Sequence, residues 1–142
     1  MISFQSINVD MPPIDQPAIT SWVKAVAASY GRRVGDVIYV FVDDEEILRV
    51  NREFLQHDYY TDIITFDNGT SAPGTSLTLA GDLIISLDTV RTNAESLHVA
   101  YEQELHRVII HGVLHLCGLN DKGPGEREQM EAAENRALDI LP

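Results

Sequence analysis

The sequence contains a single cysteine, Cys117, so no disulfide bond can form within the chain, and the thiol itself is expected to be buried and inert. One unpaired thiol suits a reducing compartment such as the cytosol. Apolar runs are also short, far below the roughly 20 residues that a membrane-spanning helix requires. Residues 1–5 lack a basic segment followed by an apolar one, which argues against a secretory signal. We therefore expect a cytoplasmic protein without a membrane partner.

Basic residues are scarce as well. Lysine and arginine total 10, whereas aspartate and glutamate total 22, which gives a formal net charge of -12 at pH 7. A chain of this charge repels nucleic acid at long range. We expect no DNA partner, and any contact with RNA would require a local patch, a metal ion or a partner protein.

The residues that are present fit one compact domain over 1–142, because 44% of them are hydrophobic and 23% are charged. Alternating or β-branched apolar runs predict strands, and apolar residues at helical spacing predict helices. The predicted strands cover 2–9, 37–42, 61–66 and 77–86, and the predicted helices cover 15–31, 43–55, 88–97, 99–116 and 126–141. Asp88 is expected to cap the third helix. This order predicts an α+β fold, with a single mixed sheet of about four strands packed with about five helices.

The segment from His111 to Asp121 carries the chemistry. His111 and His115 are four residues apart on a predicted helix, a spacing that places both imidazoles on one face, where they can hold one ion. Gly118 can adopt the left-handed conformation that ends a helix and reverses the chain, which would bring Asp121 back toward the histidines. We predict that His111, His115 and Asp121 bind a divalent metal ion, with zinc as the first expectation.

Three protein ligands with one open position are typical of a catalytic metal site, whereas a structural zinc site normally has a fourth ligand. The alternative is that the two histidines bond to carbonyl groups of the core and that Asp121 is a turn residue. A zinc protease is disfavoured, because such enzymes need a glutamate directly after the first histidine, and Gly112 occupies that position here. The pattern therefore indicates metal-dependent hydrolysis of a bond other than the peptide bond.

The same segment resembles a known family. Residues 111–118 match the His-Gly-x-Leu-His-Leu-x-Gly motif of the YbeY family of metal-dependent endoribonucleases, and Asp121 stands where that family has a third histidine. Asn51 and residues 61–66 are similar to the family's Asn and Thr-Asp-Val-Leu-Ser-Phe block, and residues 81–86 are similar to its Gly-Asp-Ile strand. Order and spacing agree over most of the chain.

The resemblance implies an endoribonuclease that cuts single-stranded RNA with the help of a metal ion. It would act in ribosomal RNA processing, at the three-prime end of the small-subunit RNA, and in ribosome quality control. His111, His115 and Asp121 would be both the metal ligands and the catalytic residues. Zn2+ is the expected ion, although a carboxylate is a harder ligand than an imidazole and can admit other divalent ions. The partners that the family implies are ribosomal RNA, a small-subunit ribosomal protein and an assembly GTPase.

Two other functions stay open. The protein could be a ribosome-assembly binding factor in which the metal is structural, a hypothesis that the net charge of -12 favours. Leu55 favours it too, because it lies where the family usually has an arginine that is thought important for ribonuclease activity, and Arg52 lies one helical turn earlier. The remaining hypothesis is hydrolysis of a small phosphoester or amide at the same metal.

Some other side chains have both a functional and a structural interpretation. Glu104 shares the helix face of His111, and it could orient a ligand, act as a base or be a solvated surface residue. Asp62 could face the metal cleft, or it could bond to backbone amides at the start of its strand. Tyr59 and Tyr60 could stack on unpaired bases, although tyrosines beside a strand more often pack against the sheet.

Overall fold

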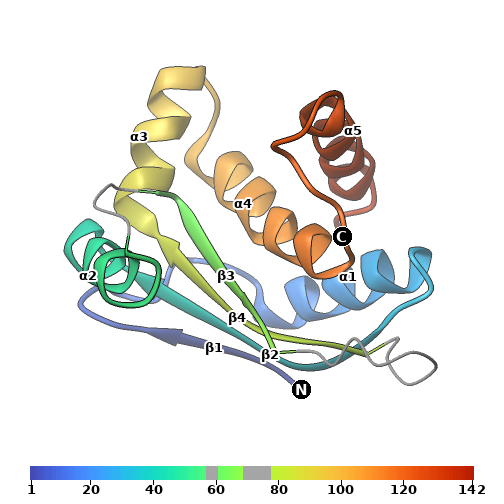
Figure 1. The fold of residues 1–142 in the computed structure, drawn as a ribbon, viewed down its shortest axis with the longest axis horizontal. Coiled ribbons are helices and arrows are strands. Elements are labelled where there is room, and N and C mark those ends of the chain that lie inside the picture. The colour runs from blue at the N-terminus through green and yellow to red at the C-terminus, as the bar shows by residue number, and fades with distance from the viewer. Residues whose placement is uncertain (57–60, 69–77) are drawn as a thin grey trace.

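The computed structural model describes residues 1–56, 61–68 and 78–142, and it confirms the predicted α+β fold. The strands are β1 (Ile2–Ser6), β2 (Arg33–Val42), β3 (Ile63–Asp67) and β4 (Thr78–Ser86). The helices are α1 (Gln16–Ser29), α2 (Asp44–Phe54), α3 (Leu87–Leu97), α4 (Tyr101–Leu116) and α5 (Glu126–Asp139). Figure 1 shows α4 lying along the sheet between α3 and α5. None of the helices in these ranges is long and apolar enough to cross a membrane.

The strands form one mixed sheet in the order β1-β2-β4-β3. β1, β2 and β4 run parallel, whereas β3 is antiparallel to β4. The parallel strands require crossover connections, and α1 supplies the one between β1 and β2. Among the described strands, β3 pairs with β4 alone, so it forms one edge of the sheet.

The two faces of the sheet are covered by different helices. Tyr39 and Phe41 of β2 belong to the larger apolar core, together with residues of α1, α3, α4 and α5. Val42 lies in a second, smaller core, where it packs with Ile47 and Val50 of α2. Successive side chains of a strand point to opposite faces, so α2 lies on the other side of the sheet from the remaining helices.

Helix α4 packs closely on the sheet. The buried Tyr39 hydroxyl on β2 donates a hydrogen bond to the Ile109 carbonyl oxygen at 3.1 Å. Gly112 has no side chain, which permits a close approach to β3 and β4. A Cβ at this position would lie 2.8 Å from Cδ1 of Ile63 and 2.9 Å from Cδ2 of Leu83. The helix that carries both histidines therefore packs across β2, β4 and β3, with Gly112 beside the edge strand β3.

The start of α3 differs from the prediction that Asp88 caps it. Ser86 is the N-cap, and its hydroxyl accepts a hydrogen bond from the Thr89 backbone N–H at 3.3 Å. Asp88 lies in the first turn, and its carboxylate accepts a hydrogen bond from the backbone N–H of Asp44 at 3.0 Å. Because β4 runs directly into α3, the cap falls on the last residue of the strand. Asp88 is then free to bind the N-terminus of α2.

We expect Gly81→Ala to lower the free energy of unfolding by about 1–3 kcal/mol, the usual cost of adding a methyl group to a well-packed site. A Cβ on Gly81 would lie 2.5 Å from the carbonyl oxygen of Phe66 on the neighbouring strand. That oxygen belongs to the backbone and cannot move without disturbing the sheet. Urea denaturation followed by circular dichroism measures the loss.

Gly112→Ala is the matched comparison. The atoms nearest to its added methyl group are the ends of the Ile63 and Leu83 side chains, which can shift. In a helix, alanine is also favoured over glycine by about 1 kcal/mol. Gly112→Ala should therefore cost less than Gly81→Ala, and an equal or greater loss would contradict this account of the sheet.

Candidate metal centre

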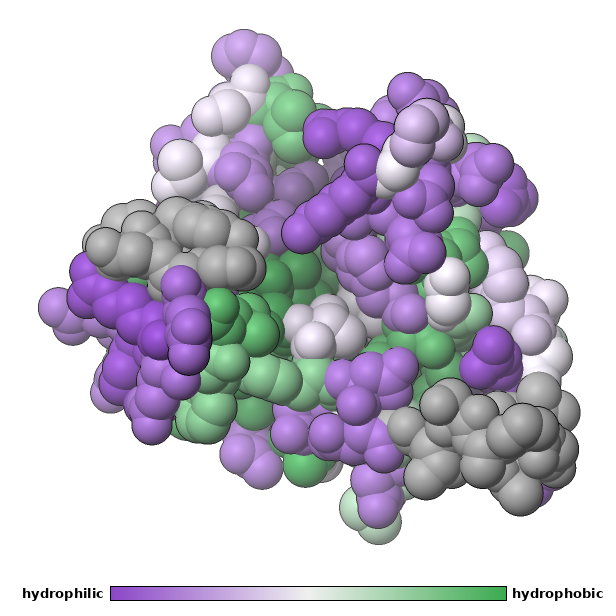
Figure 2. Space-filling view, in the orientation of Figure 1, coloured by the Kyte–Doolittle hydropathy of each residue, from purple (hydrophilic) through white to green (hydrophobic). Residues whose placement is uncertain are grey.

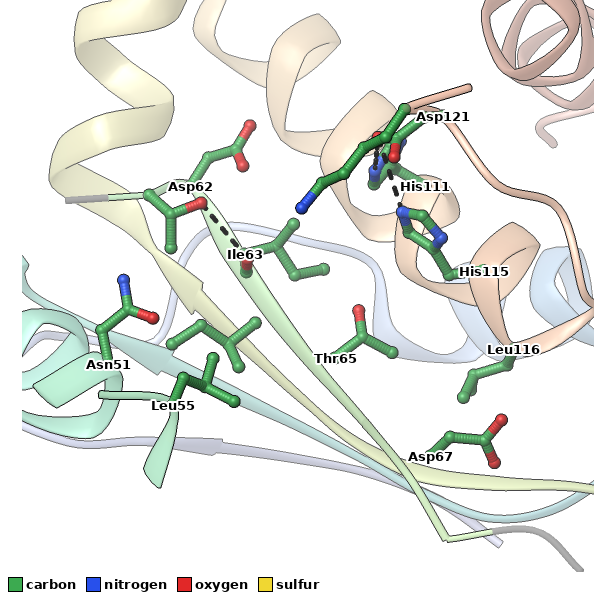
Figure 3. A pocket seen from close by; sticks show the side chains of 13 residues that line it. Asn51, Leu55, Asp62, Ile63, Thr65, Asp67, His111, His115, Leu116 and Asp121 are labelled. Atoms are coloured by element: carbon green, nitrogen blue, oxygen red, sulfur yellow. Dashed lines mark hydrogen bonds and ion pairs between the residues drawn. The ribbon is translucent and has the colours of Figure 1, made fainter. Parts of the chain in front are cut away.

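His111 and His115 lie on one face of α4, and their half-buried rings are close together. The ring centroids are 4.5 Å apart, and the ring planes are nearly perpendicular, at 85°. Helix α4 ends at Leu116, with Cys117 as its C-cap, and Gly118 adopts a left-handed conformation with φ 99°. The chain then turns back, so that Asp121 faces both histidines (Figure 3). The structure thus brings together all three predicted ligands.

The three side chains have the spacing of a coordination site. Oδ2 of Asp121 lies 3.4 Å from Nε2 of His111 and 3.6 Å from Nε2 of His115. One ligand atom from each residue lies within 4.8 Å of the others. Zinc ligands about 2.0–2.1 Å from the ion in a tetrahedron are about 3.3 Å from one another. The observed separations are long for hydrogen bonds and close to this tetrahedral edge, so the cluster could hold a metal ion.

The second ring nitrogen of each histidine is bound to the protein. Nδ1 of His111 lies 2.6 Å from Oε2 of Glu134 on α5, and Nδ1 of His115 lies 3.0 Å from the carbonyl oxygen of Leu119. A carboxylate and a carbonyl can only accept, so each Nδ1 carries the proton and each Nε2 presents its lone pair toward Asp121. Histidines that bind metals in proteins are usually oriented in this way.

Glu134 is a buried carboxylate held by two donors. Nη1 of Arg107 donates to its Oε1 at 2.8 Å, and His111 donates to its Oε2. Burial alone would raise the pKa of Glu134, but the hydrogen bonds and charges of these two donors lower it below its ordinary value. Burial alone would lower the pKa of His111, but Glu134 and the other nearby carboxylates raise it. Protons therefore compete for His111 at a higher pH than for an ordinary histidine.

The cluster lies at the junction of two pockets. The first, of about 440 Å³, is lined by the two histidines, Asp121, β3 and the end of α2. The second, of about 560 Å³, extends toward α3 and α5 and shares Asp62, His111 and Asp121 with the first. Asn51 and Leu55 face the cluster from across the first pocket (Figure 3). Figure 2 shows the hollow in this region, with apolar surface at its base and hydrophilic residues along its upper rim. We call the two pockets together the groove.

Asp62 and Glu104 both line the second pocket, beside the ligand cluster. The side chain of Glu104 is buried, with 6% exposure, so the interpretation as a solvated surface residue is wrong. Burial raises the pKa of Asp62. Burial also raises the pKa of Glu104, and the charge of Asp62 raises it further. These carboxyl groups therefore keep a proton to a higher pH than exposed carboxyl groups do.

The remaining candidates from the sequence have less to do with the cluster. Leu55 is 39% exposed and lines the first pocket, so an apolar side chain lies where the resemblance places an arginine. Cys117 is buried, as expected, and burial raises the pKa of its thiol to about 11. Tyr59 and Tyr60 lie outside the described residues.

Sequence reasoning missed Glu134 and the carbonyl group of Leu119. Glu134 does carry a signal, because it lies between Met130 and Ala137 on the buried face of α5. A carboxylate on such a face needs a buried partner, since an unpaired buried charge is costly. The carbonyl of Leu119 belongs to the backbone, so its role leaves no trace in the sequence.

Known proteins match this chain over almost its full length. A family model described as "Endoribonuclease YbeY" matches residues 5–142. A curated protein of that name from Parabacteroides distasonis is 60% identical over 141 residues, which cover 99% of this chain and 96% of the relative. The protein of the same name from Bacteroides thetaiotaomicron is 61% identical over 137 residues, 96% of each chain. The one from Porphyromonas gingivalis is 53% identical over 140 residues, 99% of this chain and 89% of the relative.

A solved structure supports the fold. The solution structure of a Thermotoga maritima protein aligns with a TM-score of 0.66 and covers 98% of this chain and 90% of that chain. Its sequence is 22% identical, so the likeness concerns the fold alone.

We expect Glu134→Gln to weaken zinc binding about 10- to 100-fold, the range found when the partner of a metal-binding histidine is replaced. Glutamine keeps the shape of the side chain but removes the negative charge beside Nδ1 of His111. Titration of the protein with zinc against a chromophoric chelator measures the affinity.

The pH dependence of zinc affinity gives a second readout. As the pH falls, the apparent zinc affinity of the wild type should begin to decrease already above a histidine's ordinary pKa of about 6.5, because the pKa of His111 is raised. Glu134→Gln removes the carboxylate that raises the pKa of His111, so the loss should move to lower pH. Glu128→Gln, at an exposed position of the same helix, is the control and should change neither the affinity nor its pH dependence. Unchanged affinity in Glu134→Gln would contradict this role for Glu134.

Proposed function

This chain belongs to the YbeY family, and we propose that the whole of it, residues 1–142, forms one metallohydrolase domain that cuts single-stranded RNA as an endoribonuclease. The observation that carries the proposal is the position of the His111, His115 and Asp121 cluster at the junction of two pockets. A groove that continues on both sides of the cluster can admit an extended strand. A small ligand is more typically enclosed in a single pocket.

We assign metal binding to Nε2 of His111, Nε2 of His115 and Oδ2 of Asp121, with zinc as the expected ion. A divalent cation at this site would lower the pKa of a bound water molecule and polarise a phosphoryl oxygen. Three protein ligands leave a position open for substrate. The carboxylate of Asp121 is a harder donor than imidazole, so the set also suits ions such as manganese.

The surrounding side chains would orient the metal ligands and supply a proton. Glu134 and the carbonyl of Leu119 hold the two imidazoles in the orientation that directs Nε2 toward the groove. Asp62 lines both pockets, so it can reach a phosphodiester on either side of the cluster. Burial favours the protonated form of Asp62, and a protonated carboxyl group at this position could pass its proton to the leaving oxygen of the bond that is cut. Glu104 is a second carboxyl group that lines the same pocket as Asp62, and the charge of Asp62 raises its pKa.

We place the reaction in the cytoplasm, in ribosomal RNA processing at the three-prime end of the small-subunit RNA and in ribosome quality control. A small-subunit ribosomal protein and an assembly GTPase would bring a chain of net charge -12 to its RNA. The same charge favours a second candidate function, a ribosome-assembly binding factor whose metal is structural. Chelation separates the two, because loss of the fold supports a structural metal, whereas an intact fold with lost cleavage supports the enzyme.

His115→Ala should reduce cleavage of a labelled single-stranded RNA by at least about 100-fold, since one of three metal ligands is lost. The circular dichroism spectrum should stay that of the wild type, because His115 lies at the wall of a pocket rather than in the core. His98→Asn is the control, at the exposed end of α3, where a left-handed conformation suits asparagine. Wild-type protein that cuts no RNA with any divalent ion would overturn the proposal.

Asp121 can be tested through metal content. Asp121→Ala should lose bound metal in elemental analysis, whereas Asp121→His should keep it and prefer zinc over manganese, because imidazole is the softer ligand. Equal metal content in the wild type and in Asp121→Ala would remove Asp121 from the site.

A further inference from the structure

Binding of RNA phosphates requires positive charge, which this chain offers in few places. It has 10 lysines and arginines against 22 aspartates and glutamates. Some of these cations are already paired with carboxylates. Arg49 pairs with Glu46 and Glu53 on α2, and Arg107 pairs with Glu134 behind the metal cluster. Each would have to leave its partner before it could bind a phosphate.

Lys122 is placed differently. It directly follows Asp121 and lines the first pocket together with His111 and His115. Among the described residues that line this pocket, Lys122 is the only lysine or arginine. It is exposed, and within the described part of the chain it forms no ion pair. Its ammonium group is therefore available to a ligand in the groove.

The loop that carries Lys122 is fixed at both ends. At its start, the backbone N–H of Leu119 donates to the carbonyl oxygen of Leu114 at 3.1 Å, and the Leu119 carbonyl binds His115. At its end, the backbone N–H of Gly123 donates to Oε1 of Glu126 at 2.7 Å. The bonds that position Asp121 thus also position residue 122, which keeps the lysine beside the metal cluster.

The negative charge of the first pocket explains why a lysine is needed there. Asp62, Asp67 and Asp121 line the same pocket, so a phosphate entering it meets three carboxyl groups. The ammonium of lysine is a compact, flexible point charge that binds phosphate oxygens without a fixed geometry. At such short range, salt screens its attraction only in part, because the screening length at physiological ionic strength is about 8 Å.

Building on the proposed function, we propose that Lys122 is the phosphate-binding residue of the first pocket. Its ammonium contacts a backbone phosphate of the single strand next to the bond that is cut, on the side of the cluster that faces β3. This contact supplies positive charge in the first pocket, whereas Arg107 and Arg127 line the second.

The test measures binding separately from cleavage. Zinc-loaded wild type and Lys122→Met are titrated against a fluorescein-labelled, nuclease-resistant single strand with methylated riboses, and fluorescence anisotropy is recorded over a range of salt concentrations. Loss of one phosphate contact should reduce the slope of log affinity against log salt by about 0.7 and weaken binding about fivefold at about 0.1 M salt. Lys122→Arg should restore both values, and zinc content should stay that of the wild type.

Lys24→Met is the matched control, because Lys24 is an exposed lysine on α1 and is not a lining residue of either pocket. It changes the net charge by the same amount and should leave the slope unchanged. An equal fall in slope in both variants would trace the effect to net charge and overturn the assignment. If the wild type cuts RNA and Lys122→Met keeps the wild-type slope and affinity, the assignment of Lys122 is overturned but the proposed function is not. Wild-type protein that neither binds nor cuts RNA would overturn the proposed function as well.

Discussion

Burial of a carboxylate inside a protein costs free energy unless hydrogen-bond donors surround it. This constraint applies to Glu134. Its two donors, Arg107 and His111, are neighbours one turn apart on α4. Their bonds dock α5 onto α4 and also fix the ring of His111 in the ligand cluster. The position of α5 and the orientation of the His111 ring are therefore coupled through Glu134.

The parts of the site that could be predicted are local in sequence. Four-residue spacing on a helix is enough to place His111 beside His115, and Gly118 is enough to mark the point where the chain turns back. The order of apolar patterns was likewise sufficient for the α+β fold with one mixed sheet. Each of these features depends on backbone geometry that repeats within a few residues, so the sequence displays it directly.

The parts that could not be predicted depend on packing between distant segments. Glu134 lies 23 residues from His111, and only the docking of two helices brings them together. Glu104 is buried in the structure, which its position on the helix does not reveal. Asp88 was expected as a cap, but the cap falls on Ser86 because β4 continues to the first residue before α3. In each case the decisive neighbour comes from another element.

The loop between α4 and α5 begins and ends with left-handed glycines, Gly118 at φ 99° and Gly125 at φ 75°. Its course is set by these glycines and by backbone hydrogen bonds, and the side chain of residue 121 has no part in them. An exchange of aspartate and histidine at this position would therefore alter the donor atom without rebuilding either helix. Under the proposed metal assignment, one codon change at residue 121 would be enough to change the preferred cation while the scaffold and the histidine pair stay the same.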